Sequence, residues 1–141
     1  MKLLVSACLL GCACRYDGKS KENADVLALL QKHEWIPVCP EQLGGLSTPR
    51  SCAERRGDRV VTSEGRDVTE HYQRGAREAL RIYRTLGCEA AVLKARSPSC
   101  GSRHIYDGTF SGVCIPGEGV CAQLLRENGV RVIDEEQLEQ L

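Results

Sequence analysis

The sequence lacks a net charge and lacks any apolar run long enough to span a membrane. Its 19 lysines and arginines balance its 19 aspartates and glutamates. Because the total charge does not attract a polyanion, tight nonspecific binding to nucleic acid would need a local basic patch, and we do not expect it. The missing apolar run excludes a transmembrane helix, so we expect no membrane association.

The residues ahead of Cys8 also lack the apolar core of a signal peptide. We therefore expect a cytoplasmic protein, and cytoplasmic thiols stay reduced. In that compartment an odd count of nine cysteines argues for metal binding or catalysis over a disulfide framework.

Two common zinc patterns are absent as well. No Cys-x-x-Cys pair occurs, although most four-thiolate zinc sites take their ligands from such close-spaced pairs. The three histidines, His33, His71 and His104, show no metal-ligand spacing and are interpreted as surface or capping residues. Ligands from distant loops, as in a metal cluster, therefore fit this sequence better than a close-spaced zinc site.

Strand and helix patterns alternate along the chain. With 141 residues, of which 42% are hydrophobic, residues 1–141 fit one domain with a real core. Short apolar runs predict strands at 3–6, 35–38, 90–93 and 130–133. Helical spacing predicts helices at 23–33, 69–86, 120–128 and 134–141, with Asn23 and Thr69 as caps. Residues 39–66 are predicted as a long functional loop with a short extended piece at 59–62. We predict an α/β fold, a single three-layer domain with a mostly parallel, Rossmann-like sheet.

Three cysteines follow three of these strands. Cys8, Cys39 and Cys100 each come directly or shortly after a buried strand, so three loops can bring one thiolate each to the carboxyl edge of a parallel sheet. Open α/β folds place their active sites at that edge. A cluster of iron and sulfide held by three thiolates keeps one iron without a protein ligand, and that iron can act as a Lewis acid toward a soft atom such as sulfur. The alternative is that the loops bury reduced thiols and bind nothing.

The other six cysteines divide into two groups. Cys12, Cys14 and Cys52 are competitors for ligand positions. Cys88, Cys114 and Cys121 lie in or beside apolar patterns, where cysteine behaves as a small hydrophobe, and are interpreted as structural.

Polar residues accompany the three candidate ligands. Glu41, two residues after Cys39, is the first candidate acid/base. Ser97 and Ser99, just before Cys100, are candidates to hydrogen-bond a substrate or a cluster sulfur, although loop serines more often satisfy turn amides. Arg50 is a candidate substrate-binding residue, with an exposed surface arginine as the alternative.

Both cysteine-containing loops at 8–20 and 100–119 run into the tripeptide Tyr-Asp-Gly, at 16–18 and 106–108. Asp-Gly is a strong turn signal. We interpret both tripeptides as loop anchors whose tyrosine packs the loop onto the core, and a catalytic role for either tyrosine is the alternative.

Several short motifs, in order along nearly the whole chain, resemble those of the thiouracil desulfidase family. They are Ser6-Ala7-Cys8-Leu9-Leu10-Gly11, Arg15-Tyr16-Asp17-Gly18, Cys39-Pro40-Glu41, Pro49-Arg50, Asp67-Val68-Thr69 and Ser97-Pro98-Ser99-Cys100-Gly101. The resemblance implies a [4Fe-4S] cluster with three cysteine ligands and one open iron. That iron takes the sulfur of a thiolated pyrimidine while water replaces the sulfur at carbon.

Carried over by position, the resemblance implies Cys8, Cys39 and Cys100 as ligands and Glu41 and Ser97 as catalytic residues. The expected substrate is a small molecule such as 2- or 4-thiouracil. Three alternatives stay open: an iron-sulfur redox module, a small zinc-binding interaction protein, and a desulfidase acting on thiouridine in transfer RNA, which the zero net charge does not favour. The oligomeric state is not indicated.

Overall fold

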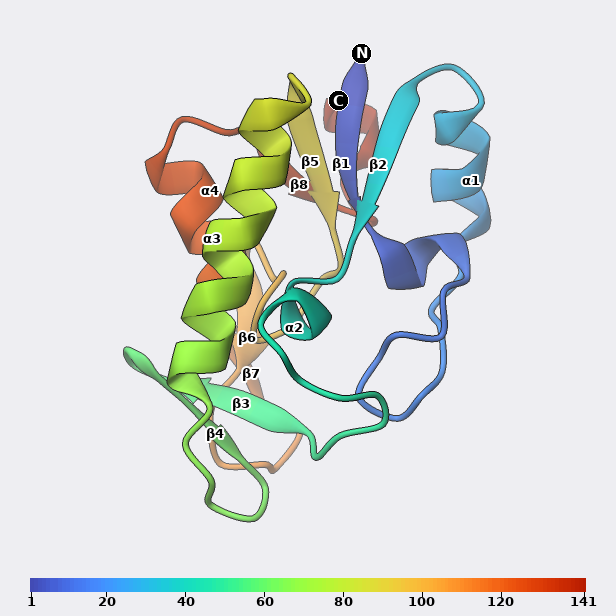
Figure 1. The fold of residues 1–141 in the computed structure, drawn as a ribbon. Helices are drawn as coiled ribbons and strands as arrows, with labels where there is room; N and C mark the ends of the chain where they lie inside the picture. Colours follow the sequence, from blue (N-terminus) through green and yellow to red (C-terminus); the bar gives the residue numbers. More distant parts are fainter.

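A four-stranded parallel sheet forms the centre of the computed structural model, which describes residues 1–141 (Figure 1). The order across the sheet is β2 (Glu34–Val38), β1 (Lys2–Ser6), β5 (Ala90–Leu93) and β8 (Val132–Asp134). All three pairings are parallel. The carboxyl ends of the strands therefore lie along one edge, as the sequence predicts.

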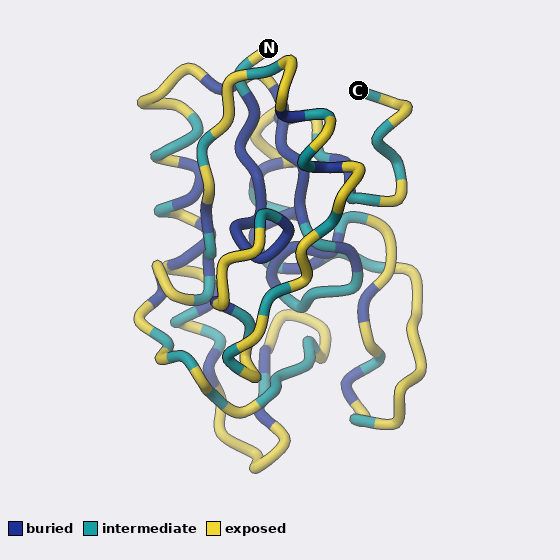
Figure 2. The backbone as a smooth tube through the Cα atoms, turned by 90° about the vertical axis from the view of Figure 1, so that its right-hand side faces the viewer, coloured by how far each residue is buried: buried dark blue, intermediate teal, exposed yellow.

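Helices cover both faces of this sheet. Side chains alternate along β1, so Leu4 packs against α3 (Thr69–Thr85) and α4 (Val120–Glu127), while Leu3 and Val5 pack on the side of α1 (Ala24–Leu30). The segments η1 (Ala7–Leu10) and η2 (Leu138–Gln140) adjoin the α1 side. Figure 2 shows the buried strands at the centre, surrounded by exposed loops. The predicted three-layer α/β fold is confirmed.

Two antiparallel hairpins and one short helix extend beyond the carboxyl edge (Figure 1). The hairpins are β3 (Ala53–Arg56) with β4 (Arg59–Thr62), and β6 (His104–Tyr106) with β7 (Cys114–Pro116). The short helix is α2 (Pro40–Leu43). The segment predicted as a long loop thus contains α2 and a hairpin, of which the sequence indicated only the 59–62 strand.

Of the two predicted helix caps, one is confirmed and one is wrong. Asn23 caps α1, since its side chain accepts a 3.0 Å hydrogen bond from the Val26 amide. Thr69 is not a cap: it is the first residue of α3, its amide donates to Asp67 at 2.9 Å, and its hydroxyl accepts from the Val60 amide. Asp67, two residues before the helix, instead supplies the side-chain acceptor for its first amide, and a carboxylate is a strong acceptor for such a group.

The predicted helix at 134–141 is also wrong. Asp134 ends β8, is 1% exposed and forms an ion pair with Arg103. Only the short η2 follows it.

No helix of the structure combines the length and apolar character that crossing a membrane requires.

Candidate active site

A cavity of about 690 Å³ opens at the carboxyl edge of the sheet. Its wall includes Cys8, Cys39 and Cys100, and also Glu41 and Ser97. These five residues, which we call the floor of the cavity, come from three loops that follow β1, β2 and β5. The structure therefore brings the predicted ligand and catalytic residues to one place.

Cys8 is held by the turn that follows β1. The short η1 segment ends at Gly11, whose φ of 99° is favourable only for glycine. The Cys8 carbonyl accepts hydrogen bonds from the amides of Gly11 and Lys21, at 3.3 and 2.9 Å. Cys8 is 8% exposed, so its thiol lies at the boundary between the core and the cavity.

Cys39 and Glu41 are positioned by the close packing of α2 against α3. Cys39 precedes the helix and Pro40 occupies its first turn, where a missing amide costs nothing. A Cβ at Gly75 would lie 1.8 Å from the Pro40 carbonyl oxygen, and one at Gly44 would lie 2.0 Å from the His71 carbonyl oxygen. Only glycine permits this approach, so two glycines fix where the Cys39 and Glu41 side chains enter the cavity.

Cys100 is held between a serine turn and the beginning of α4. The Ser97 hydroxyl oxygen accepts from the amides of Ser99 and Cys100, at 3.1 and 3.0 Å. The first amides of α4, which have no partner within the helix, donate to the carbonyls of Pro98 and Ser99. Gly119 allows the contact, because a Cβ there would lie 2.4 Å from the Ser99 carbonyl carbon.

The two candidate serines differ in position. Ser97 lies in the cavity wall, and accepting two amides leaves its hydroxyl hydrogen available to donate. Ser99 is 1% exposed, does not line the cavity, and its Oγ has no hydrogen-bond partner. Sequence spacing could not distinguish them, because the difference depends on which way the turn rotates each side chain.

The pKa values of three cavity thiols, those of Cys14, Cys39 and Cys100, are raised. Burial raises the pKa of Cys100 to about 12. The pKa of Cys14 is lowered by a hydrogen bond with Cys39 and raised by a hydrogen bond with Cys8 and by burial. The net result is a rise to about 11. The hydrogen bond with Cys14, together with burial, raises the pKa of Cys39. Ligation by a metal would have to displace these protons.

The three cysteines that are alternative ligand candidates differ in their position relative to the cavity. Cys14 is 6% exposed and lies in the cavity wall, and its backbone carbonyl accepts a 3.7 Å hydrogen bond from the Cys39 thiol. Cys52 lies in the wall and is partly buried, whereas Cys12 is exposed and outside it. No three His, Cys, Asp or Glu side chains converge closely enough to hold a single metal ion.

Arg50 lies in the cavity wall, and its guanidinium group is directed at Glu41. Its side chain is 7% exposed, and its Nε donates to Glu41 Oε2 at 2.9 Å while Nη2 contacts the same oxygen. The remaining N–H groups donate to Thr48 Oγ1 and to the carbonyls of Ser47 and Cys14, at 3.0, 3.1 and 3.0 Å. All five guanidinium donors are therefore engaged within the protein.

Tyr72 is a site residue that the sequence did not reveal. It is 3% exposed, lies in the cavity wall, and has the Glu41 carboxylate as a neighbour. Burial and the neighbouring Glu41 carboxylate raise its pKa well above the ordinary value. Its helical spacing marked Tyr72 only as an inward-facing residue, because the periodicity cannot show that this turn of α3 ends at the cavity.

The two Tyr-Asp-Gly tyrosines are not packed onto the core. Tyr16 is 41% and Tyr106 36% exposed, and both line the cavity. The turns themselves form as predicted, with glycine φ values of 75° at Gly18 and 93° at Gly108. The anchor interpretation is therefore right for the Asp-Gly turns and wrong for the tyrosine rings.

Two cationic side chains in the cavity wall, Lys94 and Arg96, are paired with carboxylates. Lys94 pairs with Glu135 at 2.9 Å, and Arg96 pairs with Glu136 at 3.1 Å.

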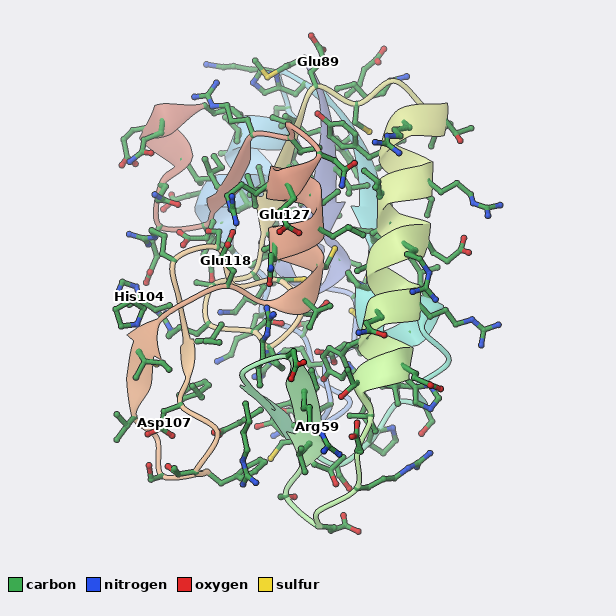
Figure 3. All side chains as sticks on the ribbon, turned by 90° about the vertical axis from the view of Figure 1, so that its left-hand side faces the viewer. Arg59, Glu89, His104, Asp107, Glu118 and Glu127 are labelled. Atoms are coloured by element: carbon green, nitrogen blue, oxygen red, sulfur yellow. The ribbon has the colours of Figure 1, made fainter.

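His71 Nδ1 lies 2.8 Å from the Gly44 carbonyl oxygen, and His104 is exposed on the β6–β7 hairpin (Figure 3). No histidine lines the cavity, in agreement with the sequence interpretation.

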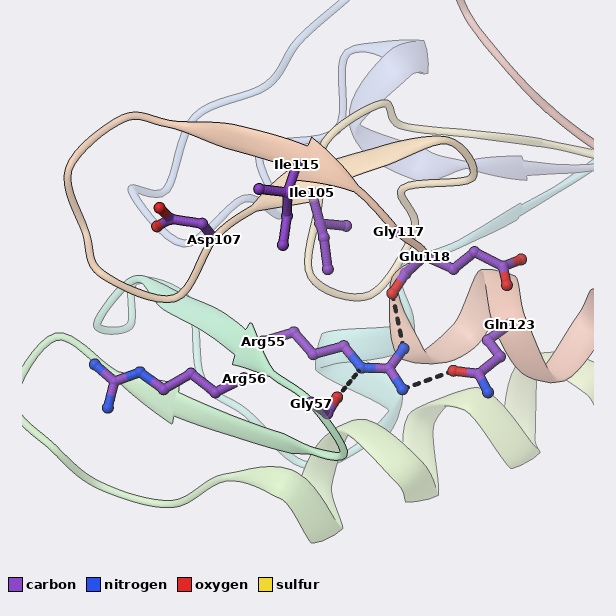
Figure 4. A pocket seen from close by; sticks show the side chains of 9 residues that line it. All are labelled: Arg55, Arg56, Gly57, Ile105, Asp107, Ile115, Gly117, Glu118 and Gln123. Atoms are coloured by element: carbon purple, nitrogen blue, oxygen red, sulfur yellow. Dashed lines mark hydrogen bonds between the residues drawn. The ribbon is translucent and has the colours of Figure 1, made fainter.

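A second hollow of about 320 Å³ lies between the two hairpins and α4 (Figure 4). Arg55 crosses it and donates to Gln123 Oε1 and to the carbonyls of Gly57 and Glu118. These bonds tie the β3–β4 hairpin to the start of α4. Arg55 therefore has a structural role in this hollow, because its hydrogen bonds hold the hairpin and α4 together.

Comparison with known proteins identifies the family of this chain. The family model described as 2-thiouracil desulfurase matches residues 3–137. The chain belongs to the 2-thiouracil desulfurase family. It is 44% identical to the uncharacterized protein YbbK of Bacillus subtilis, over 96% of this chain and 97% of that protein.

A solved structure of a family member is also similar. It is described as the [4Fe-4S]-dependent thiouracil desulfidase TudS, and it is 48% identical with a TM-score of 0.94. The similarity covers 99% of this chain and 94% of the other. The resemblance to the thiouracil desulfidase family and the predicted fold are thus confirmed.

Proposed function

We propose that this protein is a [4Fe-4S]-dependent desulfidase that converts thiolated pyrimidines, such as 2- or 4-thiouracil, into uracil and sulfide. The observation that carries the proposal is the cavity floor, where three thiols from three separate loops surround a space that also contains Glu41 and Ser97. The family and the [4Fe-4S]-dependent relative support the same reaction.

We propose Cys8, Cys39 and Cys100 as the cluster ligands. Soft thiolates are the ligands that iron-sulfur clusters use, and in a cluster each thiolate binds a different iron, so the three need not converge on one point. The cavity geometry fits this requirement, since its cysteines do not converge on a single-ion site. When bound, a cluster with one iron lacking a protein ligand supplies a soft Lewis acid for the thiocarbonyl sulfur.

The chain's own residues provide the proton transfers of the hydrolysis. Glu41 is the acid/base that takes a proton from the attacking water, and its carboxylate is kept in position by Arg50. Ser97 donates its hydroxyl hydrogen to the water or to the departing sulfur. Water contributes the oxygen of the product carbonyl and both protons of hydrogen sulfide, so no electron donor is needed.

Substrate contacts are assigned differently from the expectation of the sequence. Arg50, with all its donors engaged, acts as a positioning residue for Glu41 and leaves no donor for the substrate. Ser99, which lies outside the cavity wall, contacts the substrate only if the 97–101 turn rearranges. The balanced charge favours a small-molecule substrate over transfer RNA.

The test is anaerobic purification with analysis of iron, zinc and acid-labile sulfide, followed by a sulfide-release assay on 2- and 4-thiouracil. We expect iron and sulfide in equal amounts, about four of each per chain, and sulfide release that is lost in Glu41→Gln although the cluster is retained. Zinc, or no metal after anaerobic reconstitution, would contradict the cofactor. A loaded cluster without sulfide release would favour the alternative that the protein is an iron-sulfur redox module. Sulfide release from thiouridine-containing RNA alone would change the assigned substrate to transfer RNA.

A further inference from the structure

Aromatic side chains are scarce in this chain and are concentrated at one place. The sequence has one tryptophan, four tyrosines and one phenylalanine. Four of these six residues line the cavity: Tyr16, Tyr72, Tyr106 and Phe110. The cores on both faces of the sheet consist of aliphatic side chains, alanines and cysteines. Aromatic residues usually contribute strongly to cores, so packing alone does not account for this distribution.

Three of the four aromatic residues lie at the opening of the cavity. Tyr16 and Tyr106 are 41% and 36% exposed, and Phe110 is partly buried. Tyr72 differs, because it is buried beside Glu41. We call Tyr16, Tyr106 and Phe110 the aromatic mouth. The loop after η1 and the β6–β7 hairpin, far apart in sequence, both supply it.

The backbone beneath these rings is firmly held. The Tyr16 carbonyl accepts from the Arg50 amide at 2.8 Å, which joins its loop to the Arg50–Glu41 pair. Tyr106 pairs with Cys114 in the hairpin. Glu54 accepts from the amides of Gly108 and Phe110, at 2.9 and 3.1 Å, and ties the hairpin tip to β3. Fixed backbone under exposed rings is the arrangement expected of a recognition surface, because little entropy is lost when a ligand binds.

We infer that the aromatic mouth stacks on the flat ring of the substrate and so selects planar heteroaromatic thiocarbonyl compounds over open-chain thioamides. This inference rests on the proposed function. Ring stacking uses the π-face, which every pyrimidine presents, so the mouth does not distinguish a 2-thio from a 4-thio group. That distinction falls to the floor, where Glu41 and Ser97 meet the reacting carbon.

The test compares variants of the cluster-loaded enzyme. We expect Tyr16→Ala and Tyr106→Ala each to raise KM for 4-thiouracil about tenfold, in line with the loss of one stacking contact, with kcat nearly unchanged. Tyr16→Phe and Tyr106→Phe keep the ring and are expected to behave like the wild type. Trp35→Ala is the matched control, because Trp35 is 44% exposed but lies outside the cavity.

Thioacetamide, an open-chain thioamide, is the second substrate. Its KM is expected to be unaffected by the alanine variants, and complete failure of the wild type to use it also supports selection for the ring. An equal loss with both compounds, or a fall in kcat without a rise in KM, would overturn the inference.

Equilibrium binding of uracil separates the inference from the proposed function. If the wild type released no sulfide from any thiolated compound, the proposed function would fail. Weaker uracil binding in Tyr16→Ala but not in Trp35→Ala would still support the aromatic mouth, and unchanged uracil binding in both alanine variants would exclude it.

Discussion

The floor and the aromatic mouth of one cavity are built by different means. Two of the three floor loops are locked by contacts with helices: that of Cys39 by α2 packed on α3, and that of Cys100 by the first amides of α4. At the mouth, Tyr16 and Tyr106 each precede an Asp-Gly turn and have largely exposed rings, while Phe110 is partly buried. The difference indicates that the floor side chains are positioned by close packing of the domain, whereas the mouth holds its backbone by hydrogen bonds and leaves two of its rings free of packing contacts.

The largest effect is expected from removing a floor thiol. Cys8→Ser, Cys39→Ser or Cys100→Ser should each abolish cluster retention and sulfide release, because a hydroxyl is a poor ligand for a soft metal. Iron and sulfide analysis after anaerobic reconstitution measures the loss. Cys114→Ser, at an exposed cysteine outside the cavity, is the control and should load normally. Full loading of all three variants would remove them from the ligand set.

Breaking the Arg50–Glu41 pair should have the next largest effect. Arg50→Met leaves a carboxylate without its partner in a site where both side chains are mostly buried, 7% and 14% exposed. Such losses typically cost about 3–5 kcal/mol, so urea denaturation should detect a large loss of stability, and sulfide release should fall as Glu41 moves.

Arg50→Lys should not restore the wild-type behaviour, because an ammonium group cannot make the same five directed hydrogen bonds. Arg59→Lys alters the exposed pair with Asp67 and serves as the control, with little expected change. Wild-type stability and activity in Arg50→Met would contradict a positioning role for this residue.

A smaller effect is expected where α2 meets α3. Gly75→Ala places a methyl group against the Pro40 carbonyl, so the two helices must separate. Overpacking of this kind costs about 1–3 kcal/mol, and the free energy of unfolding and the rate of cluster loss should both show it. Gln73→Ala, on the exposed face of the same helix, should change neither. An unaltered Gly75→Ala protein would mean that the close approach is not needed to position Cys39.

The smallest effect concerns pH and the core behind the floor. Burial raises the pKa of Cys121 above its ordinary value of 9.0. The folded state therefore holds this proton more tightly than the unfolded state, and stability that is fully present below pH 9 is lost as the pH rises further. One thiol contributes at most about 1.4 kcal/mol per pH unit. Denaturation of loaded wild-type and Cys121→Ala proteins between pH 8 and about 10.5 should give a shallower decline in the variant, and parallel declines would refute the assignment.

The sequence by itself determined the sheet and the position of the floor cysteines. Strands at 90–93 and 35–38 are predicted because they are short apolar runs, and this is a local property of the sequence. Once the strands are parallel, the residues after them must share one edge. Cys8, Cys39 and Cys100 could therefore be grouped before any contact was known, and the structure brings them to one cavity.

Only the tertiary structure decided how the side chains around those cysteines are used. The charged run Ala53–Arg56 forms a strand because it pairs with β4, which its own pattern does not indicate. Arg50 turns to Glu41 nine residues away, and Tyr72 reaches the same carboxylate from α3. Tyr16 and Tyr106 line one opening although 90 residues separate them in the chain. The physical reason is that strand formation responds to local hydrophobic periodicity, whereas the partner of a polar or aromatic side chain depends on which loops fold against each other.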